Sequence, residues 1–307
     1  MELRHLQALL GIADHGGFSA AADALGTVQS NISAHVARLE RELGAVLVDR
    51  SSGRLTEEGA VVVDRSRRMM AELDALVADV AAMSREVVGL VRIGVIGSTG
   101  RWLIPQLFEQ LRAQHPRVQV SATDGINSTL EPRLLSGELD LAVVALPVLL
   151  DELSATPLFE EDLVLVVPVD HPLADRETPL PISVLADLEL LLPMPHTALR
   201  ADIDAACRRA GVSLHSAMEV DGVRLIASLT FDGYGPAILP ATAVPEHMRD
   251  RFCLLSLEDF PRRRVGVTLR QRGLPSAPTR AVIDLLYAIV AQPKRRPEGL
   301  HRLHQNN

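Results

Sequence analysis

Two short apolar-periodic runs meet at a glycine in residues 19–44, SAAADALGTVQSNISAHVARLERELG. Ser19 is of the residue type that caps a helix N-terminus, and the pattern predicts a short helix through Leu25. Gly26 makes the turn, and a second helix is predicted from about Val28 to Leu43. The pattern predicts a helix-turn-helix unit, with an ordinary helical hairpin as the alternative.

The second predicted helix has one apolar side and one side of small and polar residues. Its apolar residues recur at spacings of 4, 3 and 4 and share one stripe. The opposite face carries short side chains and can approach another surface closely, as the second helix of a helix-turn-helix does in the DNA major groove. The stripe is Ile32, Val36, Leu39 and Leu43; the opposite face is Ser30, Ala34, Ala37 and Arg41, flanked by Asn31, Ser33 and Arg38.

Residues 46–56 predict a strand, a turn and a second strand, which together form a wing. Arg50 and Arg54 bracket the turn, where two guanidinium groups can straddle a phosphate backbone. Two solvated turn charges are the alternative. Acidic residues outnumber arginines within residues 1–60, so the basic character of this region is confined to one edge.

Residues 59–88 form one long helical pattern with an apolar seam. The seam residues follow spacings of 4, 3, 4, 3 and 4, a heptad repeat. Such a strip needs a partner, either the rest of the chain or a second copy. A second copy is favoured, since a dimer engages two DNA half-sites at once. The predicted dimerisation residues are Met69, Leu73, Leu76, Val80, Met83 and Val87.

From Leu90 onward, strand and helix patterns alternate. The strands are continuous apolar runs, which is typical of a parallel α/β sheet. Two halves meeting near residues 160 and 265 would form a cleft at the switch point. Strands are predicted over 90–97, 118–122, 139–146, 162–168, 188–193, 216–220 and 236–241, and helices over 102–112, 130–135, 198–210 and around Leu225.

Composition limits the class of protein. At 307 residues the chain predicts two or more domains, and its 47% hydrophobic content fits a folded chain. A net charge of −8 argues against a globally basic nucleic-acid binder but not against a local basic patch. Two distant cysteines predict neither a disulfide framework nor a zinc site. The first residues lack a basic signal-peptide start, and no apolar run reaches the ~18 residues of a membrane span, so we expect a cytoplasmic protein.

The N-terminal motifs carry a family resemblance. The motifs are residues 17–25 (GFSAAADAL), Gln29, Ser33, residues 39–44 (LERELG), 47–50 (LVDR) and 55–59 (LTEEG). They closely resemble the N-terminal signature of LysR-type transcriptional regulators. Three later motifs look like that family's effector-domain landmarks: residues 137–142 (GELDLA), 170–173 (DHPL) and 233–240 (GYGPAILP).

The resemblance implies an α/β protein with three parts. These are a winged helix-turn-helix DNA-binding domain (1–58), a linker and dimerisation helix (59–88) and a two-lobed effector domain of the periplasmic-binding-protein type (89–293). The basic, proline-broken tail (294–307) is expected to be disordered. The implied partners are double-stranded promoter DNA with paired half-sites, a small effector, other copies in a homodimer or homotetramer, and RNA polymerase, with no membrane. No cofactor or metal is implied.

Four residues depart from the family pattern: Val28 replaces the usual serine, Ser30 a common proline, Ala34 a frequent arginine, and Val48 the usual phenylalanine. The departures affect contact strength rather than fold. Thr27 is then expected to cap the second helix, and Gln29 still presents a bidentate amide to adenine. The predicted DNA-binding residues are Thr27, Gln29, Ser30, Asn31, Ser33, Arg38, Arg50 and Arg54.

Three polar segments precede predicted helices in the effector domain: residues 97–100 (GSTG), 127–129 (NST) and 195–197 (PHT). In the family, effectors lie between the lobes, and helix N-termini favour anions. A small anionic effector is therefore expected, with hydroxyls that merely cap their own helices as the alternative. The candidate effector-binding residues are Ser98, Thr99, Asn127, Ser128, His196 and Thr197, with Arg101 and Arg200 as counter-charges.

Other functions fit the sequence less well. A transport receptor would match the effector domain alone, but it does not explain the 88 preceding residues. No nucleophile and base stand together, so an enzyme is not expected. Peroxide-sensing members of the family keep a cysteine in the helix that holds Cys207, with a reactive partner nine residues earlier, which is Ala198 in this chain. A dithiol switch is therefore not expected, and Cys207 is predicted to be a core residue.

Overall fold

The computed structural model describes residues 1–83, 86–271, 273–293 and 296–303. Its contacts divide the chain into two compact units. The first unit contains residues 1–80 with 136–138, and the second contains the remainder. Within the described ranges, the helices are all too short or too polar to cross a membrane.

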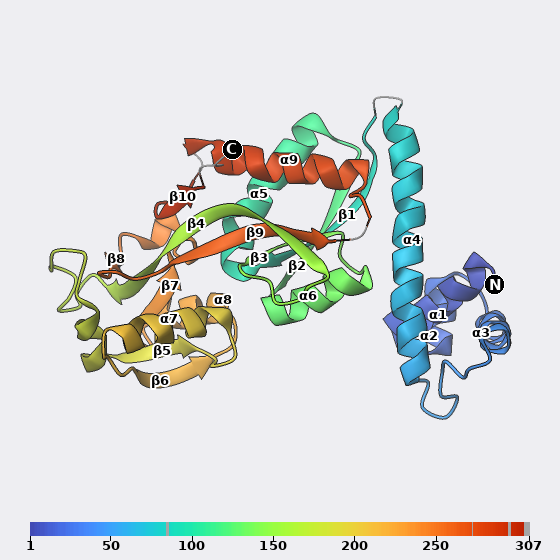
Figure 1. Ribbon diagram of the computed structural model, residues 1–307, viewed down its shortest axis with the longest axis horizontal. Helices are drawn as coiled ribbons and strands as arrows, with labels where there is room; N and C mark the ends of the chain where they lie inside the picture. Colours follow the sequence, from blue (N-terminus) through green and yellow to red (C-terminus); the bar gives the residue numbers. More distant parts are fainter. Residues whose placement is uncertain (84–85, 272, 294–295, 304–307) are drawn as a thin grey trace. The chain divides into compact units, whose positions relative to one another are not determined.

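The first unit is a helical head with its own core. Leu6, Leu9 and Ile12 of the first helix pack on buried residues of the second and third helices. The second and third helices meet at Gly26, whose positive φ of 63° makes the turn, so the predicted helix-turn-helix is confirmed. The helices of this unit are α1 (Leu3–His15), α2 (Phe18–Ala24), α3 (Gln29–Leu43) and most of α4 (Glu57–Met83) (Figure 1).

The apolar stripe of α3 is buried for three of its four predicted residues. Ile32, Val36 and Leu39 are almost fully buried, whereas Leu43 is 44% exposed. Leu43 is the last residue of α3, and Gly44 turns the chain away in the left-handed conformation. The prediction was wrong for Leu43 because the helix ends beyond the core.

The wing is smaller than predicted. It has one antiparallel bridge, between Val48 and Leu55, instead of two strands. Asp49 closes the turn by accepting hydrogen bonds from the backbone and hydroxyl of Ser51 and from the hydroxyl of Ser52. These bonds, led by the Ser51 hydroxyl, lower the pKa of Asp49 to about 2. Backbone bonds from Asp49 N to Arg54 O and from Thr56 N to Leu47 O accompany the bridge.

The second unit alternates strands and helices through two lobes. The elements in chain order are β1 (Gly89–Ile96), α5 (Gly97–Gln114), β2 (Val118–Gly125), α6 (Asn127–Ser136), β3 (Leu141–Ala145), β4 (Leu153–Pro168), η1 (Ile182–Asp187), β5 (Glu189–Pro193), α7 (Ala198–Arg209), β6 (His215–Val220), α8 (Val223–Phe231), β7 (Ala237–Pro240), η2 (Ala241–Ala243), η3 (Glu246–Met248), β8 (Phe252–Ser256), β9 (Arg262–Arg270), α9 (Ala277–Ala291) and β10 (Leu300–Arg302).

The sheet is mixed, which corrects the prediction of a parallel sheet. Its strand order is β2-β1-β3-β9-β4-β7-β5-β6, with β8 and β10 also paired to β4. The pairs at the two ends are parallel, and β4 pairs antiparallel with β9, β7 and β8. Continuous apolar runs mark strands buried on both faces, but they do not reveal strand direction.

The chain crosses between the lobes where the sequence predicted. In Figure 1, β4 and β9 run side by side. The first part of β4, through Asp162, pairs with β9, and the part from Leu163 pairs with β7 and β8. We call the part that contains β1, β2, β3, β9 and β10 the first lobe, and the part that contains β5–β8 the second lobe.

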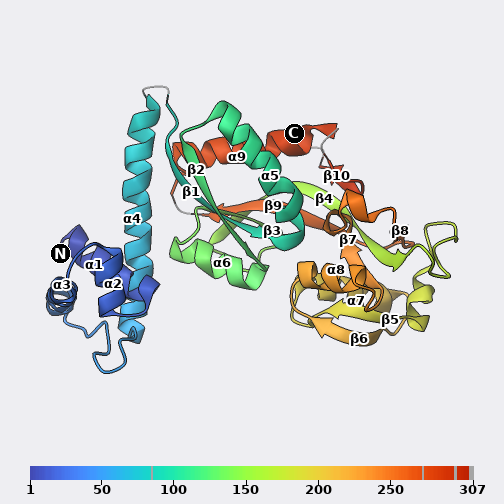
Figure 2. The ribbon, with the colours of Figure 1, turned by 180° about the vertical axis from the view of Figure 1, so that it is seen from behind.

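Each lobe has a core set by strand alternation. In the second lobe, Leu163, Leu165 and Val167 of β4 pack in one cluster with α7, while Val164 and Val166 pack in another with α8. Helices therefore cover both faces of this part of the sheet. In the first lobe, α5 and α9 contact each other, as Figure 2 shows, and share a core with β1, β3 and β9.

The C-terminal residues are more ordered than predicted. Residues 294–295 and 304–307 lie outside the described residues, but Leu300–Arg302 form β10, which pairs antiparallel with Phe159–Glu161 of β4. Leu300 is buried, and His301 Nε2 lies 2.9 Å from Asp162 Oδ2. The prediction of disorder was wrong for this segment because its backbone completes a sheet edge and its leucine joins the core.

Candidate nucleic-acid interface and ligand cavity

The first turn of α3 presents polar side chains to solvent. Gln29, Ser30 and Asn31 are all exposed, and Ser33 is half-buried. The N-cap is Val28, which makes no side-chain cap bond. Thr27 instead accepts a hydrogen bond from Asn31 Nδ2 at 3.0 Å. The expected cap by Thr27 was wrong, because the chain reaches cap geometry one residue later.

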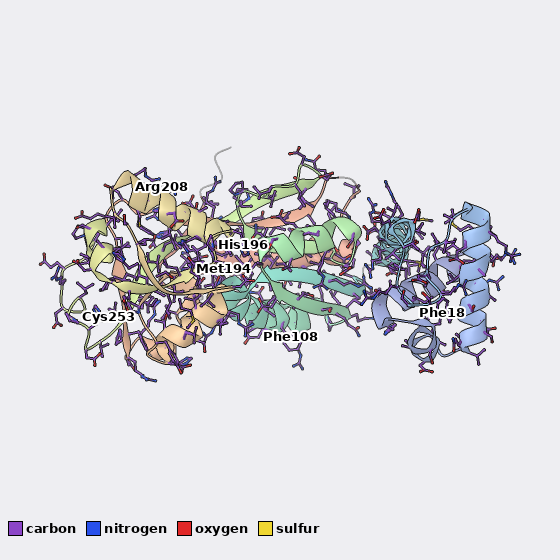
Figure 3. The ribbon with its side chains drawn as sticks, turned by 90° about the horizontal axis from the view of Figure 1, so that it is seen from below. Phe18, Phe108, Met194, His196, Arg208 and Cys253 are labelled. Carbon is purple, nitrogen blue, oxygen red and sulfur yellow. The ribbon has the colours of Figure 1, made fainter. Side chains whose placement is uncertain are left out.

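The side chain of Arg50 contacts α3 and does not extend from the wing into solvent. Its Nη1 donates to Ser33 Oγ at 2.9 Å, and its Nη2 donates to Glu40 Oε2 at 2.9 Å. The guanidinium carbon also lies 5.1 Å from the centre of the Phe18 ring, and Figure 3 labels Phe18. Arg54 is exposed. The two arginines that bracket the turn therefore have different surroundings, which the sequence did not indicate.

Arg38 and Glu42 form an exposed ion pair one helical turn apart. The Nε to Oε1 distance is 3.4 Å, and the Arg38 side chain is 55% exposed. An exposed pair of this kind contributes little to stability and leaves the guanidinium available to a phosphate. Arg38 therefore stays a predicted phosphate contact.

The seam of α4 is exposed within this single chain. Met69, Leu73, Leu76, Val80 and Met83 are all exposed large hydrophobic residues. Their exposure fits a partner helix but does not identify one. Val87 differs, because α4 ends at Met83 and Val87 packs against the core of the first lobe. The prediction for Val87 was wrong because the heptad pattern continues past the end of the helix.

Ser98 and Thr99 lie in the first turn of α5 and not in a loop before it. Both are buried. Ser98 Oγ accepts a hydrogen bond from Arg263 Nη2 at 2.6 Å, and Arg263 Nε donates to Glu161 Oε1 at 2.8 Å. Thr242 Oγ1 donates to the other oxygen of Glu161. Thr99 Oγ1 has no hydrogen-bond partner among the described residues.

The other candidate effector residues are separate from this network. Asn127 joins α6 to β3, since its Nδ2 donates to Ala145 O at 2.7 Å and its Oδ1 accepts from Ala145 N. Thr197 caps α7 by accepting from Arg200 N. Ser128 and His196 are exposed. The side chains of Asn127 and Thr197 are therefore used inside the protein, as the capping alternative predicted for Thr197.

A cavity of about 640 Å³ lies between α5 of the first lobe and α8 of the second lobe. Of the six candidate effector residues, only Ser98 lines it. Apolar side chains form much of its wall, and charged groups border it. The lining residues are Val95, Gly97, Ser98, Gly100, Arg101, Ile104, Pro105, Ala122, Asp124, Arg224, Ala227, Ser228, Phe231 and Ala243.

Two arginines and one aspartate give the cavity its charge. Partial burial, and then the nearby charge of Arg224, lower the pKa of Arg101. Arg224 Nη1 donates to Asp124 Oδ2 at 2.5 Å, which joins the two lobes. The sequence analysis named Arg101 as a counter-charge but missed Arg224 and Asp124, because these two residues are 100 positions apart and come together only in the fold.

Arg200 is not available as a counter-charge. Its guanidinium donates to Asp204, Glu219 and the carbonyl of Pro193 at 2.8–2.9 Å. Burial lowers the pKa of Arg200, but the bonds to Glu219 and Asp204 outweigh it and raise the pKa overall. The prediction for Arg200 was wrong because internal acceptors already use its donors.

Cys207 is a core residue of α7. It is 2% exposed, and burial raises the pKa of its thiol. Cys253 lies on β8 of the second lobe, is half-buried and is labelled in Figure 3. Within the described ranges, no three His, Cys, Asp or Glu side chains form a cluster that could hold a metal ion.

Comparisons with known proteins agree with this architecture. Residues 3–60 match the family described as "Bacterial regulatory helix-turn-helix protein, lysR family", and residues 84–290 match the "LysR substrate binding domain". The "Hydrogen peroxide-inducible genes activator" of Escherichia coli O6:H1 is 30% identical over 290 residues, which cover 93% of each chain.

Two solved structures are similar along most of the chain. A full-length OxyR variant from Pseudomonas aeruginosa has a TM-score of 0.73 and 25% identity, and the match covers 94% of this chain and 97% of that one. The "Crystal structure of full-length CbnR complexed with the target DNA complex" has a TM-score of 0.68 at 22% identity; the match covers 94% of this chain and 98% of that one and supports the fold. The chain therefore belongs to the LysR family of DNA-binding transcriptional regulators and joins a helix-turn-helix domain to an effector-binding domain.

Proposed function

We propose that α3 reads the major groove of promoter DNA at paired half-sites, and that a homodimer or homotetramer formed through α4 presents two heads at once. The exposed polar first turn of α3 carries this proposal. Gln29, Ser30, Asn31 and Ser33 offer hydrogen-bond donors and acceptors near the N-terminus of α3, where side chains can reach base edges. Arg38 and Arg54 supply phosphate contacts at its margin.

The exposed seam of α4 supports the oligomer. Five large apolar side chains at heptad positions lie exposed on one helix, a costly arrangement in water unless a second helix covers it. Two joined heads also bind a paired site far more tightly than either head alone. The seam residues of this proposal are Met69, Leu73, Leu76, Val80 and Met83.

We further propose that a small anionic effector occupies the cavity between α5 and α8. Arg101 and Arg224 provide positive charge there, and an apolar wall accommodates the body of the ligand. Because α5 and α8 belong to different lobes, a ligand held by both changes the equilibrium between lobe arrangements. The change in lobe arrangement alters DNA binding through the joined heads.

Peroxide sensing is the second candidate, because the E. coli relative is named for induction by hydrogen peroxide. The chemistry of Cys207 argues against a dithiol switch in this chain. The thiol is buried with a raised pKa, and the residue nine positions earlier is Ala198. We expect DNA binding by Cys207→Ser to match wild type with and without peroxide, in a gel-shift titration. A peroxide response that the substitution abolishes would favour the redox function instead.

The proposed DNA function is tested by footprinting the purified protein on the DNA upstream of its own gene. Two protected half-sites one or more helical turns apart are expected, because a two-fold dimer places two heads on one face of the duplex. A charge substitution in the α4 seam, Leu76→Glu, should convert paired protection to weak or absent protection. Full paired protection by a monomeric variant would contradict the role of α4.

A further inference from the structure

The guanidinium of Arg50 already makes several contacts inside the protein, unlike that of an arginine that is fully exposed to solvent. Its guanidinium is held on three sides: by the Phe18 ring, by Ser33 Oγ and by Glu40 Oε2. Two donors point in a fixed fork toward two acceptors on α3, the arrangement that arginine favours over lysine. These bonds use two of the five N–H donors of the guanidinium and fix the direction in which the group points.

Glu40 connects the same site to the wing. Its Oε1 accepts hydrogen bonds from the backbone N–H groups of Leu47 at 2.9 Å and Val48 at 3.3 Å, while its Oε2 accepts from Arg50. The Glu40 side chain is 14% exposed. Burial raises the pKa of Glu40, but the bonds from Leu47 and Arg50 outweigh it, and the pKa lies below its ordinary value. A charged carboxylate therefore ties the start of the wing to α3.

The bond to Ser33 fixes what this serine offers to DNA. A hydroxyl has one hydrogen and two acceptor lone pairs. Since Arg50 occupies a lone pair of Ser33 Oγ, the hydroxyl hydrogen remains for another group. Acceptors in the major groove are N7 of purines, O6 of guanine and O4 of thymine.

We infer that Arg50 and Glu40 are positioning residues that orient Ser33 as a hydrogen-bond donor to a base acceptor in the major groove. This inference rests on the proposed reading of DNA by α3. It replaces the expectation from sequence that Arg50 contacts a phosphate. Arg54, which is exposed at the other end of the wing turn, keeps the phosphate role.

The test measures sequence preference and charge contacts separately. Wild-type protein first selects its preferred duplex from a random-sequence pool, and each variant is then titrated with salt on that duplex and on a shuffled one. Arg50→Gln should lower the affinity ratio between the two duplexes about tenfold. The salt slope on the shuffled duplex should stay unchanged, whereas loss of one phosphate contact lowers it by about 0.9.

Glu40→Gln gives the sharpest contrast. Removing a negative charge near DNA should tighten binding if only electrostatics matter. Loss of positioning should instead weaken selective binding while non-selective binding tightens. Glu42→Gln is the matched control, because it removes the same charge from α3 without touching the wing and should keep the wild-type preference.

Two further variants distinguish loss of positioning from loss of the folded structure. Arg50→Lys keeps the charge but cannot form the two-donor fork, and it should lose preference like Arg50→Gln. Ser33→Ala should lose preference at the same base position as both Arg50 variants and Glu40→Gln. Unchanged helical circular dichroism and melting temperature of Arg50→Lys relative to wild type are expected.

The outcomes separate the two proposals. A reduced salt slope for Arg50→Gln, with equal weakening on both duplexes, would overturn the positioning role and leave DNA reading by α3 intact. Loss of preference at a base position different from that of Ser33→Ala would overturn it as well. If the wild-type protein enriches no sequence from the pool, the proposed function fails, and this inference fails with it.

Discussion

Polar residues at helix starts have different roles in the helical head and in the effector domain. The first turn of α3 exposes Gln29, Ser30 and Asn31. In the effector domain, Ser98 accepts a bond from Arg263, and Asn127 bonds to Ala145. The same sequence pattern therefore marks a free face in one region and internal joints in the other. The difference lies in whether the side chains bond to distant segments of the fold, as Ser98 and Asn127 do.

The buried ion pair of the effector domain should give the largest effect. Arg263 and Glu161 are 5% and 0% exposed. Arg263→Ala leaves the Glu161 carboxylate without its cationic partner, and we expect it to lower the free energy of unfolding by about 3–5 kcal/mol. Trp102 is the single tryptophan and packs against Phe159, so its fluorescence in urea follows this domain.

The adjacent Arg264 is the control for this prediction. It forms an exposed pair with Glu160 at 3.6 Å, and its side chain is 52% exposed. Arg264→Ala should change the free energy of unfolding by under about 1 kcal/mol. Equal losses of unfolding free energy for Arg263→Ala and Arg264→Ala would mean that the buried pair stabilises the domain no more than an exposed pair. The contrast between internal joints in this domain and a free face on α3 would then fail.

Asn127 tests whether a helix-start residue is an internal joint. Asn127→Ala leaves the backbone N–H and C=O of Ala145 without these bonds, and we expect a loss of about 1–3 kcal/mol in the same urea experiment. Ser128→Ala changes an exposed neighbour and should stay within about 0.5 kcal/mol of wild type. If Asn127→Ala leaves the free energy of unfolding unchanged but abolishes the response to an effector, Asn127 binds the ligand and is not an internal joint.

The pair of Arg224 and Asp124 is expected to have a smaller effect. Asp124 competes with an anion for Arg224, so Asp124→Asn should strengthen anion binding about two- to fivefold, while Arg224→Gln should weaken it. The measurement is the shift of the Trp102 melting transition across a panel of carboxylates and phosphates. Weaker binding by Asp124→Asn would show that the carboxylate assists the ligand.

The smallest expected effect is the pH dependence of the head. The folded pKa of Glu40 lies below the ordinary value of 4.5. Its contribution to stability is therefore fully present above pH 4.5 and is lost as the pH falls through the folded value. Melting temperatures of wild type and Glu40→Gln should differ at pH 7 and converge in strong acid. A difference in melting temperature that increases as the pH falls would contradict the predicted direction.

The sequence predicted most helices and apolar strands up to residue 241, because period and turn residues are local, but it predicted no element for β8, β9 or α9. It predicted the helix-turn-helix at Gly26 and the crossing of the lobes near residues 160 and 265. It missed the antiparallel pairing of β4 and the strand β10, since strand direction and edge pairing depend on distant segments.

Site residues were less predictable for the same reason. The acceptors of Arg200 and Arg50 lie in other turns or elements, and the bond between Arg224 and Asp124 joins residues 100 positions apart. No local pattern reports such partners. Exposure of Ser30 could be predicted, because its helix face lies opposite a clear apolar stripe.

The most direct measurement of DNA reading by α3 is a salt titration of wild type and the double variant Gln29→Ala/Ser33→Ala, on the selected duplex and on a shuffled one. The double variant should bind both duplexes with the affinity that wild type shows for the shuffled one, and its salt slope should equal that of wild type, since neither side chain carries charge. A folded double variant that still prefers the selected duplex as strongly as wild type would contradict the role of α3 as the reading helix.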